Sequence, residues 1–105
     1  MPELVIEKIR KAVLKGEINI RRHAHRRMFK RGVLFEEARE VILHGDLIET
    51  YPKAKPFPAY LFMGLLKEGE PLYVLCGFDG ETVYIITVHW LEPQKWIDPW
   101  TRRRR

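Results

Sequence analysis

The chain of 105 residues is long enough for one small domain, and its 46% hydrophobic content excludes a disordered protein. The formal net charge is +5 and is uneven, with basic blocks at 21–31 and 102–105. This asymmetry favours a polyanionic partner, nucleic acid rather than membrane, although a Lys/Arg/Glu-rich composition is also typical of proteins from hot-living microbes.

The cysteine content and the hydropathy pattern indicate the cellular compartment. Cys76 is the only cysteine, so no internal disulfide can form, which fits a reducing environment. The N-terminal segment carries charges throughout and lacks the apolar stretch of a signal peptide, and no apolar run approaches the roughly 20 residues of a membrane span. We therefore expect a cytoplasmic protein with no membrane partner.

The first predicted helix covers residues 3–15. Apolar residues recur there with helical spacing and form one face, and Gly16 directly after them suits a helix end. The following segment INIR, at 18–21, is expected to be a short extended connector. The apolar face of the helix must therefore find its partner elsewhere in the fold.

Two further helices are predicted, at 23–31 and at 35–45. The first ends at Gly32 and belongs to the run RRHAHRRMFKRGV, at 21–33, which holds six Lys or Arg and no acidic residue. The second, FEEAREVILHG, has acidic residues in its first turn and His44 in its last, as the helix dipole favours.

From residue 46 onward the sequence pattern changes to strands. The predicted strands are 47–51, 60–66, 72–78 and 82–90. Prolines make YPKAKPFPAY a loop, Gly64 is a candidate bulge, and Asp79-Gly80 indicates a hairpin. Helices followed by strands predict a single α+β domain at 1–100, with helices packed on a three- to four-stranded antiparallel sheet, and a basic, disordered tail at 101–105.

Several linked segments resemble a prokaryotic family of unassigned function. They are HAHRRMFKRGV, FEEAREVILHG, IETYP, KPFPAYLFMG, PLYVLCG and YIITVHW, followed by Trp96. The G-V-x-F-E-E-A part is also similar to BrnT toxins, which are similar in fold to RelE-type ribonuclease toxins. The resemblance implies a RelE/BrnT-like fold and a toxin-type domain, a metal-independent endoribonuclease, with an acidic antitoxin-like protein as a further partner.

The family pattern can be placed residue by residue. Its matching positions are His23, Arg27, Met28, Arg31, Gly32, Pro56, Pro58 and Trp96. Tyr73 stands where the family usually has His, His89 where it usually has Tyr, and Leu91-Glu92 replaces Pro-Asp. If Tyr73 and His89 share a surface, one His and one Tyr are kept there. Their register is not fixed by the sequence.

Cleavage of RNA without a metal requires a base for the 2′-hydroxyl proton, cations for the phosphate charge and an acid for the leaving oxygen. Histidine titrates near neutrality, and arginine grips phosphate with a planar fork. The candidate catalytic residues are His23, Arg27, Arg31 and His89. The candidate nucleic-acid contacts are Arg22, Arg26, Lys30, Tyr73 and Tyr84. No cofactor is expected, and RNA or another polyanion is the expected partner.

The basic helix also has structural interpretations. Helical spacing puts His23, Arg27 and Arg31 on one stripe, and this stripe can be a solvated face or can pair with the acidic helix. The glutamates available for such pairs are Glu36, Glu37 and Glu40. His23 can instead cap its helix, and His89 can be a half-buried strand residue held by hydrogen bonds. If the basic helix is purely structural, this is simply a small stable protein. A separate alternative is a non-catalytic module that uses the fold to bind nucleic acid or an acidic partner.

A metal site is not expected. His25 lies about 200° round the helix from His23, so the two do not face the same ion. Together with His44, His89 and Cys76 they match no compact zinc arrangement. The tryptophans can stack on bases or close the end of the sheet, and the chain end can pack back on the domain through them. These tryptophans are Trp90, Trp96 and Trp100.

Overall fold

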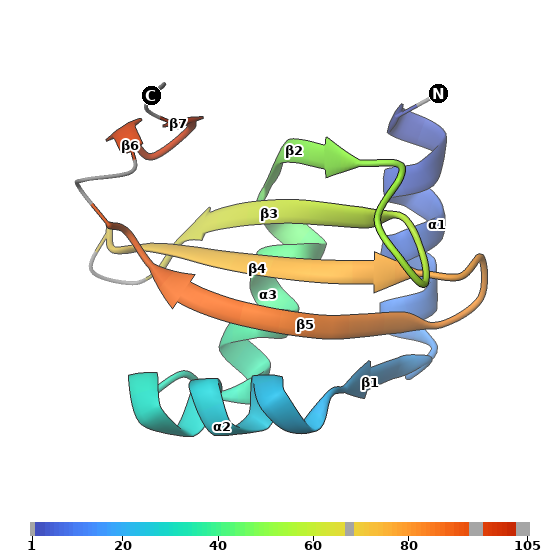
Figure 1. Ribbon diagram of the computed structural model, residues 1–105, viewed down its shortest axis with the longest axis horizontal. Coiled ribbons are helices and arrows are strands. Elements are labelled where there is room, and N and C mark those ends of the chain that lie inside the picture. The colour runs from blue at the N-terminus through green and yellow to red at the C-terminus, as the bar shows by residue number, and fades with distance from the viewer. Residues whose placement is uncertain (1, 67–68, 93–95, 103–105) are drawn as a thin grey trace.

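The computed structural model of the protein describes residues 2–66, 69–92 and 96–102 (Figure 1). The elements in chain order are α1 (Pro2–Leu14), β1 (Ile18–Ile20), α2 (Arg22–Arg31), α3 (Phe35–His44), β2 (Asp46–Tyr51), β3 (Ala59–Leu65), β4 (Pro71–Phe78), β5 (Val83–Trp90), β6 (Trp96–Asp98) and β7 (Thr101–Arg102). The three helices and four main strands lie within two residues of their predicted limits, and the α+β class is confirmed.

The sheet has five strands in the order β1-β5-β4-β3-β2. Strands β2 to β5 form the predicted antiparallel meander, but β1 pairs in parallel with β5, so the expectation of a purely antiparallel sheet of three or four strands was wrong. The segment expected to be a connector supplies the fifth strand. Three residues are too short to show strand alternation, and their partner lies at the other end of the sequence.

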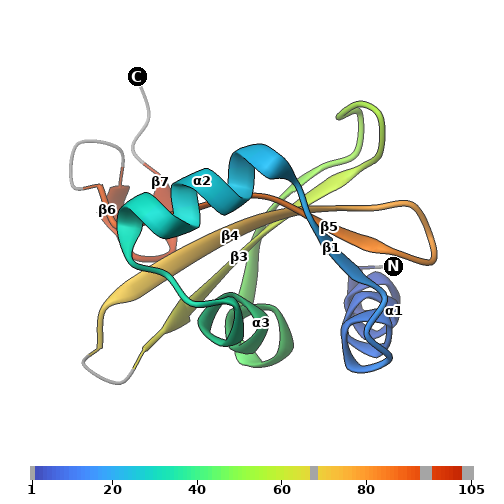
Figure 2. The same cartoon turned by 90° about the horizontal axis from the view of Figure 1, so that it is seen from below.

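Helices α1 and α3 cover one face of the sheet (Figure 2). The core between them combines residues of both layers: Ile9, Val13, Ala38, Val41, Ile42, Phe62, Val74, Val83 and Ile85. Alternation along β3 sends Phe62 to this side and Leu61 and Met63 to the other. There they form a second, smaller apolar cluster with Tyr73 of β4, so the open face of the sheet also buries side chains.

Helix α2 lies beside β5 instead of on the helix-covered face (Figures 1 and 2). Strand β1 pairs with the first residues of β5, from Val83 to Ile85, and the chain then enters α2. Farther along β5, the Arg31 guanidinium donates to the Val88 carbonyl, and the Trp90 indole nitrogen donates to the Arg31 carbonyl at 2.9 Å. These two bonds fix the end of α2 against the second half of β5.

Two turns depend on residues that the sequence identified. Gly32 ends α2 with a left-handed backbone, at φ 66°. In the β4–β5 hairpin, Gly80 has φ 102°, and the Asp79 carboxylate accepts hydrogen bonds from the backbone of Glu81 at 2.8 Å and of Thr82 at 2.7 Å. The hairpin predicted from Asp79-Gly80 is confirmed.

Gly64 was wrongly predicted to mark a bulge. It pairs regularly with Leu72, whereas the irregularities lie elsewhere: in β2 between Leu47 and Glu49, and opposite Leu75 and Cys76, where β5 holds an extra residue. A β-carbon at Gly64 would lie 3.0 Å from Cγ2 of Val41 in α3. The glycine therefore allows close packing of a helix on the sheet.

The C-terminal segment returns to the sheet. Strands β6 and β7 pair with each other, the Tyr73 hydroxyl donates to the Pro99 carbonyl at 2.6 Å, and the Trp100 indole nitrogen donates to the Asp46 carboxylate at 2.8 Å. Of the predicted tail, Thr101 and Arg102 form β7, and 103–105 lie outside the described residues, as does the Trp96 side chain. No helix in the described ranges is long and apolar enough to cross a membrane.

Candidate functional site

A groove runs between α2 and the open face of β5. It encloses about 360 Å³, and its lining residues are His23, Arg27, Arg31, Ile86, Thr87, His89 and Glu92. We call it the basic groove. The four residues that sequence reasoning selected as catalytic candidates all line it. They come from two segments that are far apart in the sequence, so their convergence is a property of the fold.

The geometry of α2 explains why its stripe faces the groove. Ala24 and Met28 are buried and anchor one side of the helix in the main core. His23 and Arg27 precede them by one position each, so they lie on the adjacent flank, toward β5. Arg22, Arg26 and Lys30 are exposed and do not line the groove. Of the predicted cations, α2 thus brings two to the groove and leaves three on its outer surface.

The extra residue in β5 determines which side chains the strand presents. Leu75 faces Thr87 and Cys76 faces Ile85, so Ile86 has no partner of its own in the ladder. Beyond this bulge the alternation is shifted by one residue, which buries Val88 and places Thr87 and His89 on the groove. The hydroxyl of Thr87 is enclosed and has no hydrogen-bond partner among the described residues.

His23 and Arg27 form a hydrogen-bonded pair one helical turn apart. The Arg27 Nε donates to His23 Nε2 at 2.6 Å. Because a guanidinium can only donate, this bond requires a lone pair on Nε2 and therefore a neutral His23 ring with its proton on Nδ1. The pair thus places a fixed positive charge directly on the lone pair of an imidazole.

The ring of His89 packs on a buried tyrosine. Its ring stacks on Tyr73 with 5.1 Å between ring centroids and 14° between planes, and the two residues face each other across β5 and β4. The register thus puts these two residues on one surface. Tyr73 itself is fully buried, so it lies under the groove and supports His89 from below.

Glu92 is the ionisable residue of the groove that sequence reasoning did not select, beside the uncharged Ile86 and Thr87. The His89 Nδ1 lies 4.0 Å from a Glu92 carboxylate oxygen and 3.3 Å from the Trp90 carbonyl. A carboxylate at this distance stabilises the ring when it carries a positive charge. The signal for it was present in the sequence, because Glu92 stands where the resembled pattern has an aspartate.

Two glutamates of α3, Glu37 and Glu40, have partners within α3 and its N-cap. The Glu37 carboxylate accepts from the Leu34 backbone at 2.8 Å, and Glu40 lies 3.7 Å from His44 and 4.0 Å from Arg39. In residues 2–66, 69–92 and 96–102 no ion pair joins α2 to these glutamates. The structure therefore does not pair the arginines of the stripe with the acidic helix.

Tyr84 lies outside the basic groove, near the start of β5. Its ring stacks on Phe57 at 5.4 Å, and the Arg21 guanidinium lies 4.9 Å from its centroid. Its hydroxyl donates to Asp79 at 3.0 Å, which raises the pKa of Tyr84. The pKa of Asp79 is held below its usual range, mainly by the backbone N–H groups of Thr82 and Glu81.

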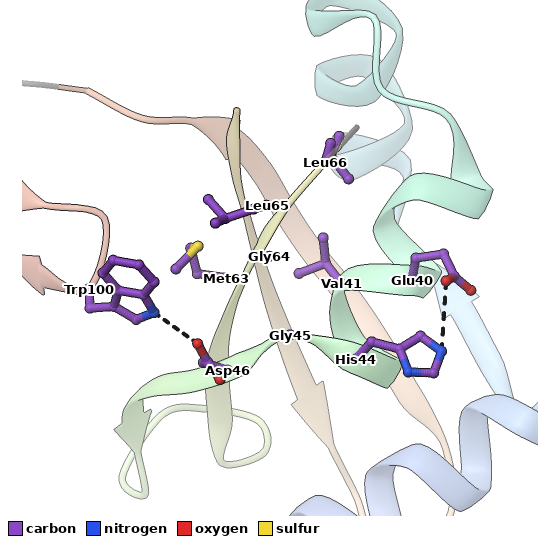
Figure 3. Close-up of a pocket in the computed structure, with 10 residues that line it drawn as sticks. All are labelled: Glu40, Val41, His44, Gly45, Asp46, Met63, Gly64, Leu65, Leu66 and Trp100. Atoms are coloured by element: carbon purple, nitrogen blue, oxygen red, sulfur yellow. Dashed lines mark hydrogen bonds and ion pairs between the residues drawn. The ribbon is translucent and has the colours of Figure 1, made fainter. Parts of the chain in front are cut away.

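A second pocket lies at the junction of α3, β2 and β3 (Figure 3). It encloses about 290 Å³ and contains none of the predicted site residues. Its polar side chains are paired with each other, His44 with Glu40 and Trp100 with Asp46 (Figure 3). It therefore offers fewer groups for chemistry than the basic groove.

Metal and thiol chemistry find little support in the described parts of the chain. No group of three or more His, Cys, Asp or Glu side chains there could hold a metal ion. Cys76 is buried in the core, and burial raises the pKa of its thiol to about 12. At neutral pH it is a packed apolar side chain, not a nucleophile.

Comparison with known proteins gives a family without an assigned activity. No curated protein and no solved structure matches the chain significantly. A family model matches residues 20–90, which include α2 and all of β5 and thus every basic-groove residue except Glu92. The chain belongs to this family, which is described as a domain of unknown function, DUF4258.

Proposed function

We propose that the protein is a RelE/BrnT-like toxin-type domain that cleaves RNA in the basic groove without a metal. The observation that carries the proposal is the convergence of His23, Arg27 and Arg31 from α2 with His89 from β5 around one groove. Two imidazoles beside fixed cations supply the three groups that metal-independent cleavage needs.

Arg27 and His23 act together on the reacting phosphate. When the phosphate enters, Arg27 turns to it, because a charged phosphate is a stronger acceptor than a neutral imidazole. His23 Nε2 is then released to take the proton from the 2′-hydroxyl. The 2′-oxygen bonds to phosphorus as the bond to the 5′-oxygen breaks, which leaves a 2′,3′-cyclic phosphate.

His89 completes the reaction as the acid. In its protonated form, balanced by the Glu92 carboxylate, it gives a proton to the leaving 5′-oxygen. The Tyr73 stack holds the ring in place. Arg31 supplies positive charge to the groove while its bond to the Val88 carbonyl fixes α2 on β5.

The test is cleavage of single-stranded RNA in EDTA by the wild type and by His23→Ala, Arg27→Ala and His89→Ala. Each substitution is expected to lower the rate by roughly 10²- to 10⁴-fold, the usual contribution of one acid–base group or oriented charge. His25→Ala is the matched control, since His25 lies on α2 but does not line the groove. An inactive wild type, or equal rates for all variants, would disprove the site.

A non-catalytic binding module is the second candidate. The exposed outer surface of α2, with Arg22, Arg26 and Lys30, favours it, because such a surface attracts RNA or an acidic antitoxin-like protein without any chemistry. This candidate predicts binding that weakens steeply with salt and no product in EDTA. Binding together with slow loss of intact RNA would favour the ribonuclease instead.

A further inference from the structure

The open face of the sheet carries a second depression beside the basic groove. It encloses about 580 Å³ and is lined almost entirely by apolar atoms. Its floor consists of Ala59, Leu75 and Ile86 from β3, β4 and β5, and Tyr51 and Lys53 lie at the end of β2 and in the loop that follows. We call this depression the apolar trough.

The trough and the basic groove lie next to each other and share one lining residue. Ile86, the extra residue of the β5 bulge, lines both. Arg27 therefore lies on one side of the apolar surface and Lys53 on the other. Apolar surface flanked by cations on two sides matches the alternation of bases and phosphates along a single strand of RNA.

The backbone under the trough argues against a peptide as the occupant. Leu75 and Ala59 belong to β4 and β3, and each of these strands pairs on both sides. An extended peptide lying across Leu75 and Ala59 would find the backbone of both strands already paired, and peptides that join a sheet do so at an edge. A nucleobase needs only an apolar or aromatic surface and finds one in the trough.

Tyr51 supplies the aromatic surface. It is 38% exposed, and its hydroxyl donates to Glu49 in the same strand. Tyr51 lines the trough, where an aromatic ring can cover one face of a base. No part of the proposed cleavage chemistry uses this residue.

We infer that the apolar trough binds the nucleobase next to the phosphate that enters the basic groove, with Tyr51 as its stacking residue. The inference deepens the proposed function and rests on it, since it assigns single-stranded RNA, with bases accessible, as the substrate class. Duplex RNA would keep its bases stacked inside the helix and away from Tyr51.

The test measures binding separately from cleavage. Fluorescein-labelled 2′-O-methyl RNA, which lacks the attacking hydroxyl, is compared by anisotropy with an abasic strand of equal length and phosphate count. Wild-type protein is expected to prefer the base-bearing strand by roughly 5- to 150-fold, the range for one base–aromatic stack. Tyr51→Ala is expected to lose this preference and Tyr51→Phe to keep it, because only the ring is needed.

The outcomes distinguish the inference from the proposed function. Equal affinity of wild type for both strands overturns the trough assignment and leaves ribonuclease activity open to its own assay. A base preference that depends on Tyr51, in a protein that cleaves no RNA, supports the trough and refutes the ribonuclease. Failure to bind either strand at low salt overturns both.

Discussion

At the residue scale, single polar contacts give the two histidines of the groove different surroundings. Arg27 holds a lone pair of His23, and Glu92 lies beside His89, so two imidazoles in one groove have different surroundings. The residue types and the stripe on α2 were readable from the sequence. The bond from Arg27 to His23 was not, because it depends on rotamers, and Glu92 was visible only through its place in the resembled pattern.

The Cys76 thiol provides a test of burial at a single residue. With its pKa raised to about 12 by burial, it carries almost no thiolate at pH 8 and is shielded from reagents. We expect iodoacetamide to leave the folded protein unmodified at pH 8 and to alkylate it fully in guanidinium, as measured by mass spectrometry. Comparable rates in both conditions would contradict the buried position.

The contribution of Asp79 to the stability of the β4–β5 hairpin depends on pH. Its pKa is lowered by hydrogen bonds to the backbone of Thr82 and Glu81, so its contribution to stability is complete above the ordinary aspartate pKa of about 3.9 and is lost as pH falls through the lower folded value. The stability difference between wild type and Asp79→Ala should therefore shrink between pH 5 and 2. A Glu81→Ala control, which keeps the turn carboxylate, should show no such convergence in urea titrations.

At the element scale, the segments with clear periodicity were predicted and the short one was not. Helices α1 and α3 and strands β3 to β5 carry apolar patterns long enough to identify them. Strand β1 has three residues, and its partner was beyond the reach of any local pattern. Gly64 was misassigned because a glycine in a strand signals either a bulge or close packing, and only the neighbouring Val41 shows which.

The docking of α2 on β5 can be tested at Trp90. Trp90→Phe keeps most of the apolar contact but removes the donor to the Arg31 carbonyl, and we expect a loss of about 1 kcal/mol in urea unfolding, the usual net value of one hydrogen bond. Trp100→Phe removes a similar bond, to Asp46, from a side chain that is 48% exposed. That control should cost less, since water replaces an exposed bond.

The junction of α3 and β2 is a second test at this scale. A β-carbon at Gly45 would lie 2.4 Å from the Met63 carbonyl oxygen and 2.5 Å from the Val41 carbonyl oxygen. Both atoms belong to the backbone, so neither can shift without moving β3 or α3. Gly45→Ala should destabilise the protein by about 1–3 kcal/mol or more. Gly69→Ala meets no atom within 4 Å and serves as the comparison for steric effects, its remaining cost being that of φ 75°.

At the scale of the whole molecule, the two faces of the sheet carry different features. The helix-covered face holds the main core, and the open face holds the small cluster around Tyr73, the basic groove and the apolar trough. Of the basic block at 21–31, Arg27 and Arg31 lie at this open face, and Arg22, Arg26 and Lys30 lie on the outer surface of α2. The sequence could indicate the charge but not its position beside a concave surface, which needs the β5 bulge.

The contribution of the outer surface of α2 is measurable through salt dependence. Replacing Arg22, Arg26 and Lys30 by Gln should weaken RNA binding and reduce the slope of log K against log salt by about 0.7 for each phosphate that the variant no longer neutralises. The matched control changes Lys8, Lys11 and Lys15, three exposed lysines of α1 and the turn after it, by the same charge. Equal slopes for both triple variants would show that only net charge matters.

The parallel pairing of β1 with β5 has a consequence for folding during synthesis on the ribosome. Translation delivers α2 early, but the strand that it lies against is the last long strand of the sheet. Contacts between residues so distant in sequence form late, after the intervening meander has been made. In a nascent chain, α2 therefore has no β5 to pack against until β5 emerges from the ribosome. The basic groove forms only then, so the unfinished polypeptide cannot have any activity of the groove.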